Sequence, residues 1–244
     1  MSRPLVVAHK GASAYLPGNT LAAYDLAIRM GADCIELDVQ LTGDGNIVVY
    51  DRWYVEDGEL QRPVIELSLN RIRQLWSQET SRNTQRDPSD LLTLQQVLSH
   101  LAPTRVELMV ELKNSRLLQP PSLGQRVTDA LNSADMLSRA YLFSYDHELI
   151  AAVKSSNVRR GILYVGRLVN ITETLRATQA NFIETRNDFL DPGFVARLHQ
   201  MGVQVCGWST DDEKEIMRLV NLSADMVTTD SPDLARKVID RVRG

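Results

Sequence analysis

Short runs of apolar and β-branched residues alternate along the chain with longer amphipathic segments. The first run, Leu5–His9, is followed by a loop and then by residues 19–31, in which Leu21, Tyr24 and Ile28 share one helical face. Pairs of this kind recur as far as the C-terminus. This order predicts an α/β protein in which each strand is followed by a helix.

The pattern also gives the expected elements. We expect strands over residues 5–9, 34–41, 106–113, 140–144, 161–166, 181–185, 203–209 and 225–230, and helices over 19–31, 91–101, 123–133, 147–156, 168–178, 192–202, 211–222 and 231–243. A turn over 43–46 followed by a short returning strand is expected directly after the second strand.

About eight β–α units in this order predict a closed (β/α)8 TIM barrel. An open doubly wound sheet is the alternative, and the barrel is favoured because no GxGxxG follows the first strand. The rhythm lapses over residues 52–90, where we expect an insertion containing one short helix at Leu69–Trp76. We expect residues 1–244 to form a single domain, a size typical of such barrels.

Charge and composition narrow the partners of the protein. The 244 residues contain 27 Lys and Arg against 31 Asp and Glu, which gives a formal net charge of −4. This balance argues against a nucleic-acid binder that neutralises phosphates over a wide surface. No window approaches the ~20 apolar residues of a membrane span, and the apolar run near the N-terminus is too short for a signal peptide. We therefore expect a soluble protein which, in a bacterium, would be located in the cytoplasm.

The two cysteines, Cys34 and Cys206, both lie within apolar runs. We expect buried free thiols because a disulfide framework would need a richer set of cysteines. No CxxC or His/Cys cluster indicates a zinc site. The oligomeric state cannot be derived from the sequence.

Charged side chains gather where the expected strands end. Glu36 and Asp38 are two residues apart on one strand, so they point to the same face, and Glu111 and Lys113 are spaced in the same way on the next strand of the expected barrel. In a TIM barrel, the carboxyl ends of the strands form the active-site face. Three carboxylates there favour a hard divalent cation, Mg²⁺ or Ca²⁺, and together with Lys113 and the nearby Lys10 they indicate a site for a phosphate group.

The segment AHKGASAYLPGNTLAAYDLAIRMGADCIELDVQLTGDGNIVVYD resembles the opening of the glycerophosphodiester phosphodiesterases, with the family pattern HRG, PENT, E.DV and VV.HD. The resemblance extends to VELMVELK, to Gly207–Trp208 and to ADMVTTDSPDLA. It implies a TIM barrel with an insertion after the second strand. It also implies metal-dependent cleavage of a small glycerophosphodiester to glycerol phosphate and an alcohol, in glycerol and lipid metabolism.

The resemblance also assigns roles to individual residues. It implies that Glu36, Asp38 and Glu111 bind the metal and that His9 is one of two catalytic histidines. It further implies that Lys10 and Lys113 contact the phosphate and that Trp208 forms a wall for the alcohol portion.

Three positions depart from the family pattern. The second catalytic histidine is matched to Tyr50, which can donate a hydrogen bond but is a poor base because its ordinary pKa is about 10. Lys10 replaces an arginine and Gly18 replaces the glutamate of PENT. These departures leave two functions open: a slow or altered phosphodiesterase, and a weakened phosphate-ligand binder on the same scaffold.

The mechanism implied by the resemblance also leaves alternatives open. One histidine would deprotonate the attacker, either water or a neighbouring glycerol hydroxyl that forms a cyclic phosphate, and the other would protonate the leaving oxygen. Tyr50 either takes the second role or only fills space. His147, which follows the strand 140–144, is a further candidate for that role.

Overall fold

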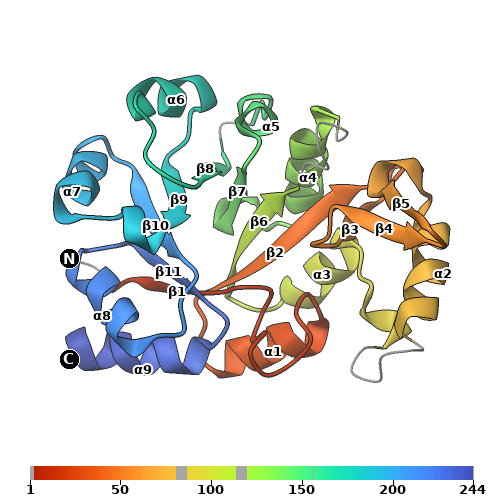
Figure 1. The fold of residues 1–244 in the computed structure, drawn as a ribbon, viewed down its shortest axis with the longest axis horizontal. Coiled ribbons are helices and arrows are strands. Elements are labelled where there is room, and N and C mark those ends of the chain that lie inside the picture. The colour runs from red at the N-terminus through yellow and green to blue at the C-terminus, as the bar shows by residue number, and fades with distance from the viewer. Residues whose placement is uncertain (1–2, 81–86, 114–119, 156, 244) are drawn as a thin grey trace.

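The structure is a computed structural model that describes residues 3–80, 87–113, 120–155 and 157–243. Eight parallel strands form a barrel that is closed by pairing of the first strand with both the second and the last (Figure 1). In barrel order these strands are β1 (Leu5–Ala8), β2 (Cys34–Leu41), β6 (Glu107–Leu112), β7 (Ala140–Ser144), β8 (Arg159–Tyr164), β9 (Phe182–Arg186), β10 (Gln204–Trp208) and β11 (Met226–Thr229). The expected TIM barrel is confirmed.

Helices surround the barrel and follow its strands in turn. They are α1 (Leu21–Arg29), α3 (Leu94–Leu101), α4 (Ser122–Ser133), α5 (His147–Ala151), α6 (Ile171–Thr178), α7 (Pro192–Gln200), α8 (Glu213–Asn221) and α9 (Pro232–Arg243). Local chemistry explains where they begin. Thr20, for example, caps α1 by accepting a hydrogen bond from the Ala23 amide, and Asp191 caps α7 ahead of Pro192.

Additional elements lie between β2 and α3. The returning strand β3 (Ile47–Val49) pairs antiparallel with β2, as expected. The helix α2 runs over Leu69–Thr80, one turn longer than the expected helix. Short 3₁₀ turns occur at Val64–Glu66 and Pro88–Asp90. The expected insertion also covers residues 81–86, which lie outside the described residues.

A hairpin in this region was not predicted. It consists of β4 (Tyr54–Asp57) and β5 (Leu60–Pro63), which pair antiparallel beside α2 (Figure 1). Its two-residue connection contains Gly58, whose φ of +67° is readily adopted by glycine. The Asp57-Gly58 pair, a common turn sequence, was the available signal.

Two kinds of apolar core hold the barrel together. Large clusters fill the space between the strands and the helices, and a separate cluster fills the barrel interior. In the interior, the rings of Tyr141 and Phe182 meet edge to face with centroids 5.2 Å apart. Gly161 leaves room for this pair, because a Cβ there would lie 2.2 Å from the Phe182 ring. The interior is thus packed solid beneath the open end.

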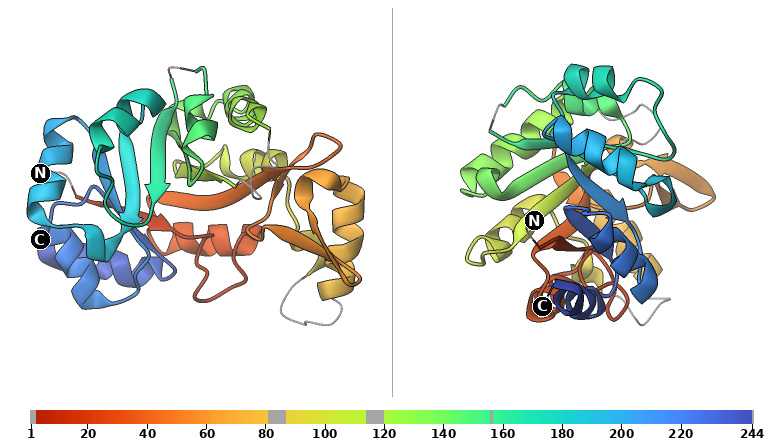
Figure 2. Two further views of the ribbon diagram at one scale, coloured as in Figure 1. Left: turned by 45° about the horizontal axis from the view of Figure 1, so that its top comes forward. Right: turned by 90° about the vertical axis from the view of Figure 1, so that its left-hand side faces the viewer.

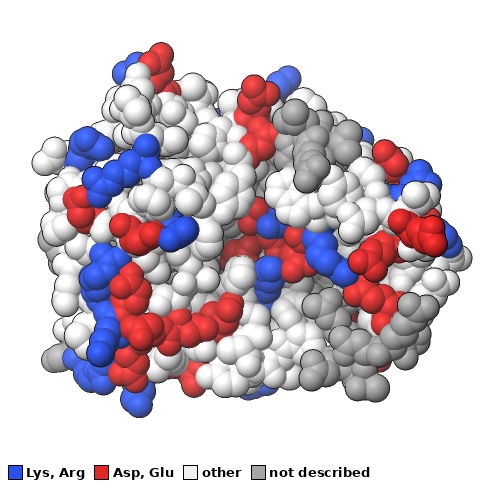
Figure 3. All heavy atoms as spheres, viewed as in Figure 1, with Lys and Arg blue, Asp and Glu red and all other residues white. Residues whose placement is uncertain are grey.

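The carboxyl ends of the strands open onto one face of the molecule. Figure 3 shows acidic and basic side chains meeting in a hollow near the middle of this face, with the insertion at one side of the molecule and both termini at the other (Figures 1 and 2). None of the helices in the described part of the chain combines the length and the apolar character that a membrane crossing requires. Cys34 and Cys206 are buried free thiols, as expected.

Candidate metal and phosphate site

Three carboxylates meet at the open end of the barrel. The register of β2 and β6 places Asp38 beside Glu111, and Glu36 lies on the same face of β2, two residues earlier. Glu36, Asp38 and Glu111 are all buried, and each offers an oxygen within 4.8 Å of the others. The structure therefore brings together the three residues that were expected to bind metal.

Lysine side chains approach this cluster from two directions. The Lys113 ammonium lies 2.9 Å from Asp38 Oδ1 and 2.9 Å from Glu111 Oε1. Lys10 Nζ lies 3.8 Å from Asp38 Oδ2, which also accepts a hydrogen bond from Asn19 at 3.1 Å. Lys113 is thus a cation held between two of the carboxylates, which is the charge that the cluster requires.

The electrostatics of the cluster show the repulsion of buried like charges. Burial and the neighbouring Asp38 raise the pKa of Glu36 well above its ordinary value. Burial likewise raises the pKa of Glu111 to about 7, although the Lys113 ammonium opposes this shift. For Asp38, burial acts upward, but Lys113 and Lys10 outweigh it and lower the pKa. Buried carboxylates of this kind fit a hard divalent cation with oxygen ligands.

His9 directly follows β1 beside the cluster, and an acidic side chain holds its ring. Its Nδ1 lies 2.7 Å from Asp230 Oδ1, at the end of β11, and Ser13 Oγ donates to the same oxygen at 2.8 Å. Burial alone would lower the pKa of His9, but the hydrogen bond to Asp230 and the charge of Glu36 raise it to about 9. The imidazole is therefore oriented and favours its protonated form.

The loop after β1 depends on two glycines. Gly11 has a φ of +86°, and a Cβ there would lie 2.7 Å from the backbone of Ala23. A Cβ at Gly18 would lie 2.9 Å from Lys10 Cβ. Two departures from the family pattern thus touch each other, because a side chain at position 18 would collide with Lys10 as it is placed here.

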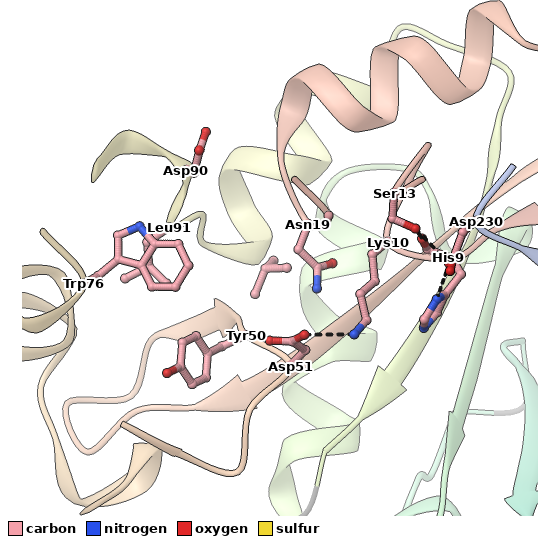
Figure 4. Close-up of a pocket in the computed structure, with 12 residues that line it drawn as sticks. His9, Lys10, Ser13, Asn19, Tyr50, Asp51, Trp76, Asp90, Leu91 and Asp230 are labelled. Carbon is pink, nitrogen blue, oxygen red and sulfur yellow. Dashed lines mark hydrogen bonds and ion pairs between the residues drawn. The ribbon is translucent and has the colours of Figure 1, made fainter. Parts of the chain in front are cut away.

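The structure places Tyr50 away from the carboxylates. Its hydroxyl donates to the Tyr54 carbonyl oxygen at 3.3 Å, and its ring meets Trp76 of α2 edge to face. Burial raises the pKa of Tyr50 to about 12. The next residue, Asp51, points the other way and accepts a hydrogen bond from Lys10 Nζ at 2.8 Å (Figure 4).

Two cavities adjoin the cluster and share His9. One, of about 210 Å³, lies between the loop after β1 and the insertion, and its lining includes Lys10, Asp51, Trp76 and Asp230 (Figure 4). The other, of about 150 Å³, opens above the barrel interior. Its lining includes His9, Glu36, Glu111, Lys113, Tyr145, Glu184 and Trp208.

The second cavity contains two groups with free bonding capacity. Trp208 Nε1 is buried and has no hydrogen-bond partner among the described residues. Burial raises the pKa of Glu184 to about 6, although the Thr228 hydroxyl donates to this carboxylate at 2.7 Å and opposes the shift.

The remaining histidines lie elsewhere. His147 Nε2 donates to the Leu163 carbonyl oxygen at 3.1 Å, so the structure does not bring it to the carboxylates. His100 pairs with Asp25 and His199 with Asp225, and neither histidine is among the residues that line the two cavities.

Sequence reasoning missed several contacts of the site. It did not assign Asp51 to the site or identify Asn19 as a partner of Asp38. The alternation of residues along β3 was the signal for Asp51, because residues two apart share a face.

Comparison with known proteins agrees with this geometry. The sequence profile described as the Glycerophosphoryl diester phosphodiesterase family matches residues 9–234. A glycerophosphodiester phosphodiesterase of Caldanaerobacter subterraneus subsp. tengcongensis is 26% identical over 95% of this chain and 96% of its own. Another, from Bacillus altitudinis, is 24% identical over 98% of this chain and 99% of its own.

A solved structure shares the fold. The Oleispira antarctica phosphodiesterase in complex with the product sn-glycerol-3-phosphate superposes with a TM-score of 0.82, at 24% identity, over 98% of this chain and 97% of that one. The fold and the buried acidic cluster thus define a TIM-barrel protein with a charged site at the carboxyl ends of its strands. The match over residues 9–234 specifies it further: the chain belongs to the glycerophosphoryl diester phosphodiesterase family.

Proposed function

We propose that this protein is a metal-dependent hydrolase that cleaves glycerophosphodiesters to glycerol phosphate and an alcohol. The observation that carries the proposal is the buried cluster of Glu36, Asp38 and Glu111, whose oxygens lie within 4.8 Å of one another beside His9 and two lysines. Membership of the family and the relatives named as glycerophosphodiester phosphodiesterases support the same reaction.

Glu36, Asp38 and Glu111 would hold the ion, which is Mg²⁺ or Ca²⁺ on the chemistry of its ligands. Such an ion neutralises charge on the phosphate oxygens as the reaction proceeds. Lys10 and Lys113 would contribute further positive charge to the same group. Of the two lysines, Lys113 lies nearer to the carboxylates, because its ammonium bridges Asp38 and Glu111.

His9 is the proposed proton donor to the leaving oxygen. Its hydrogen bond with Asp230 fixes the ring and favours the protonated imidazole, which can donate a proton. Trp208, which lines the cavity above the barrel interior, would form a wall for the glycerol portion. Tyr50, whose hydroxyl is engaged by Tyr54, would pack the insertion against the barrel and take no proton.

The products would place the enzyme in glycerol and lipid metabolism. The two buried thiols support a reducing compartment such as the cytoplasm.

A weakened phosphate-ligand binder is the second candidate. The observation that favours it is that His9 is the only histidine lining the two cavities within the described residues. Loss of one general acid or base typically costs about 10²–10⁴ in rate.

The test is incubation of the purified protein with glycerophosphocholine and either Mg²⁺ or Ca²⁺, with release of choline followed over time. Turnover that EDTA abolishes and added metal restores supports the hydrolase. Saturable binding of the diester without release of product, at high protein concentration, would support the binder instead.

A further inference from the structure

Asp51 is the first acidic residue after β3, and its side chain enters the cavity that His9 and Lys10 line (Figure 4). Two-residue alternation along an extended chain explains this placement. Tyr50 packs with Trp76 in the apolar cluster of the insertion and lines one end of this cavity, whereas Asp51 is directed toward Lys10 (Figure 4). The side chain is about one third exposed and is thus accessible to a ligand in the cavity.

The other carboxylates of this cavity have defined partners. Asp230 accepts hydrogen bonds from His9 and Ser13, and Asp90 accepts one from the Asp87 amide. Asp51 accepts one from Lys10 Nζ at 2.8 Å, and no other side chain among the described residues donates to it. A carboxylate that pairs with an ammonium has three remaining lone-pair positions.

Lys10 lies between Asp51 and His9. Figure 4 shows its ammonium reaching toward Asp51, with the His9 ring on the far side of the Lys10 side chain. The same ammonium lies 3.8 Å from Asp38 of the carboxylate cluster. A phosphate bound to Lys10 and to an ion on that cluster would therefore have the imidazole and the Asp51 carboxylate on different sides.

Hydrolysis of a phosphodiester needs two proton transfers, one from the attacking oxygen and one to the leaving oxygen. Two side chains at the described site suit these two proton transfers. His9 has a ring N–H to donate, whereas Asp51, as the partner of an ammonium, is an acceptor.

We propose that Asp51 is the general base of this enzyme and accepts the proton of the attacking hydroxyl. The inference rests on the proposed function. As the O–H bond breaks, its proton passes to Asp51 and the oxygen forms a bond to phosphorus. The bond from phosphorus to the alcohol oxygen breaks, and that oxygen takes a proton from His9. Exchange with solvent then returns one proton to His9 and removes one from Asp51, so charge and atoms balance.

The test compares two substrates that differ only in the leaving alcohol: glycerophosphocholine and the p-nitrophenyl ester of glycerol phosphate. Nitrophenolate needs no proton to leave, whereas choline does. The variants are Asp51→Asn and His9→Asn. Asp90→Asn, which removes another carboxylate from the same cavity wall, is the matched control.

We expect Asp51→Asn to lower kcat by about 10²–10⁴ on both substrates, because the attacking oxygen needs a base in each case. We expect His9→Asn to have a much lower kcat than the wild type on glycerophosphocholine. On the p-nitrophenyl ester, its kcat should be close to that of the wild type. Asp51→Glu should retain part of the activity, which would show that the fold of the site is intact.

Three results would overturn the inference while leaving the proposed function in place. They are wild-type kcat in Asp51→Asn, rescue of Asp51→Asn by the p-nitrophenyl ester, and a change in KM alone that Lys10→Met reproduces. The last result would mean that Asp51 only positions Lys10. Absence of turnover by the wild type on either substrate would overturn the proposed function itself, and the role of Asp51 with it.

Discussion

His9 shows how one residue can join the two ends of the chain. It lies in the loop after β1, yet its orientation depends on Asp230, which follows β11. The sequence indicated the histidine but could not indicate this partner, because the two residues meet only when the barrel closes. Local sequence motifs therefore indicate which residue types form the site. They do not indicate which residues pair, and those pairs set the pKa values.

The pair formed by His9 and Asp230 predicts a pH dependence of stability. The pKa of His9 rises from 6.5 to about 9 on folding. The pair therefore makes its full contribution to the free energy of unfolding below pH 6.5, and this contribution decreases as the pH rises toward 9. In EDTA, the difference in Tm between the wild type and His9→Asn should be largest at pH 6 and should vanish above pH 9.5. Thermal unfolding followed by circular dichroism measures it, and a difference that grows with pH would contradict the assignment.

Addition of a single methyl group at Gly161 should disrupt the packing of the barrel interior. A Cβ at this position would lie 2.2 Å from the Phe182 ring, which is fully buried, so Gly161→Ala should destabilise the barrel by about 1–3 kcal/mol. Gly193→Ala is the matched control, because Gly193 lies in the first turn of α7 and alanine favours helices. Urea unfolding of both variants checks this prediction. An unchanged midpoint for Gly161→Ala would mean that the ring moves aside freely.

Strands β2 and β6 carry the three carboxylates that we propose as metal ligands, and the register of these strands was predictable only in part. Spacing two residues apart correctly placed Glu36 with Asp38 on one face of β2. The pairing of Asp38 with Glu111 required the order of the barrel strands, which the β–α rhythm supplied. The hairpin β4–β5 escaped prediction because each strand has only four residues and mixed polarity, too few to show a period.

The raised pKa of Glu111 on β6 predicts that the effect of metal on thermal stability depends on pH. Burial raises the pKa of Glu111 to about 7 from 4.5, so without metal the ionised form costs stability as the pH rises through this range. Metal binding requires ionised carboxylates. The increase in Tm on adding Mg²⁺ or Ca²⁺ should therefore grow from pH 5 to pH 8.

The variant Glu111→Gln should lose most of this metal-induced increase. Glu107→Gln is the control, since Glu107 lies at the opposite end of β6 and pairs with Arg159. An increase in Tm that is equal for the two variants would show that the metal binds elsewhere.

Over the whole molecule, the insertion packs on the barrel through a shared apolar cluster. Val48 and Tyr50, in and just after β3, contribute to it together with Ile72, Leu75 and Trp76 of α2. We propose that the barrel and the insertion unfold as one cooperative unit. The expectation of a single domain thus becomes a measurable property.

Tryptophan positions allow a test of this cooperativity. Trp53 and Trp76 report on the insertion, whereas far-ultraviolet circular dichroism reports mainly on the barrel and its helices. The two signals should give the same urea midpoint. A fluorescence midpoint at lower urea concentration than the circular dichroism midpoint would show that the insertion unfolds separately. The variant Trp208→Phe, which lacks the tryptophan of the barrel, should then show the same fluorescence midpoint.

We propose that one divalent cation binds between Glu36, Asp38 and Glu111. Anomalous diffraction from a crystal grown with Mn²⁺ tests it most directly. The account predicts a single strong peak at about 2.0–2.4 Å from an oxygen of each of the three side chains, with the Lys113 ammonium displaced from its place between Asp38 and Glu111. A Mn²⁺ peak elsewhere, with Lys113 still bridging the two carboxylates, would contradict it.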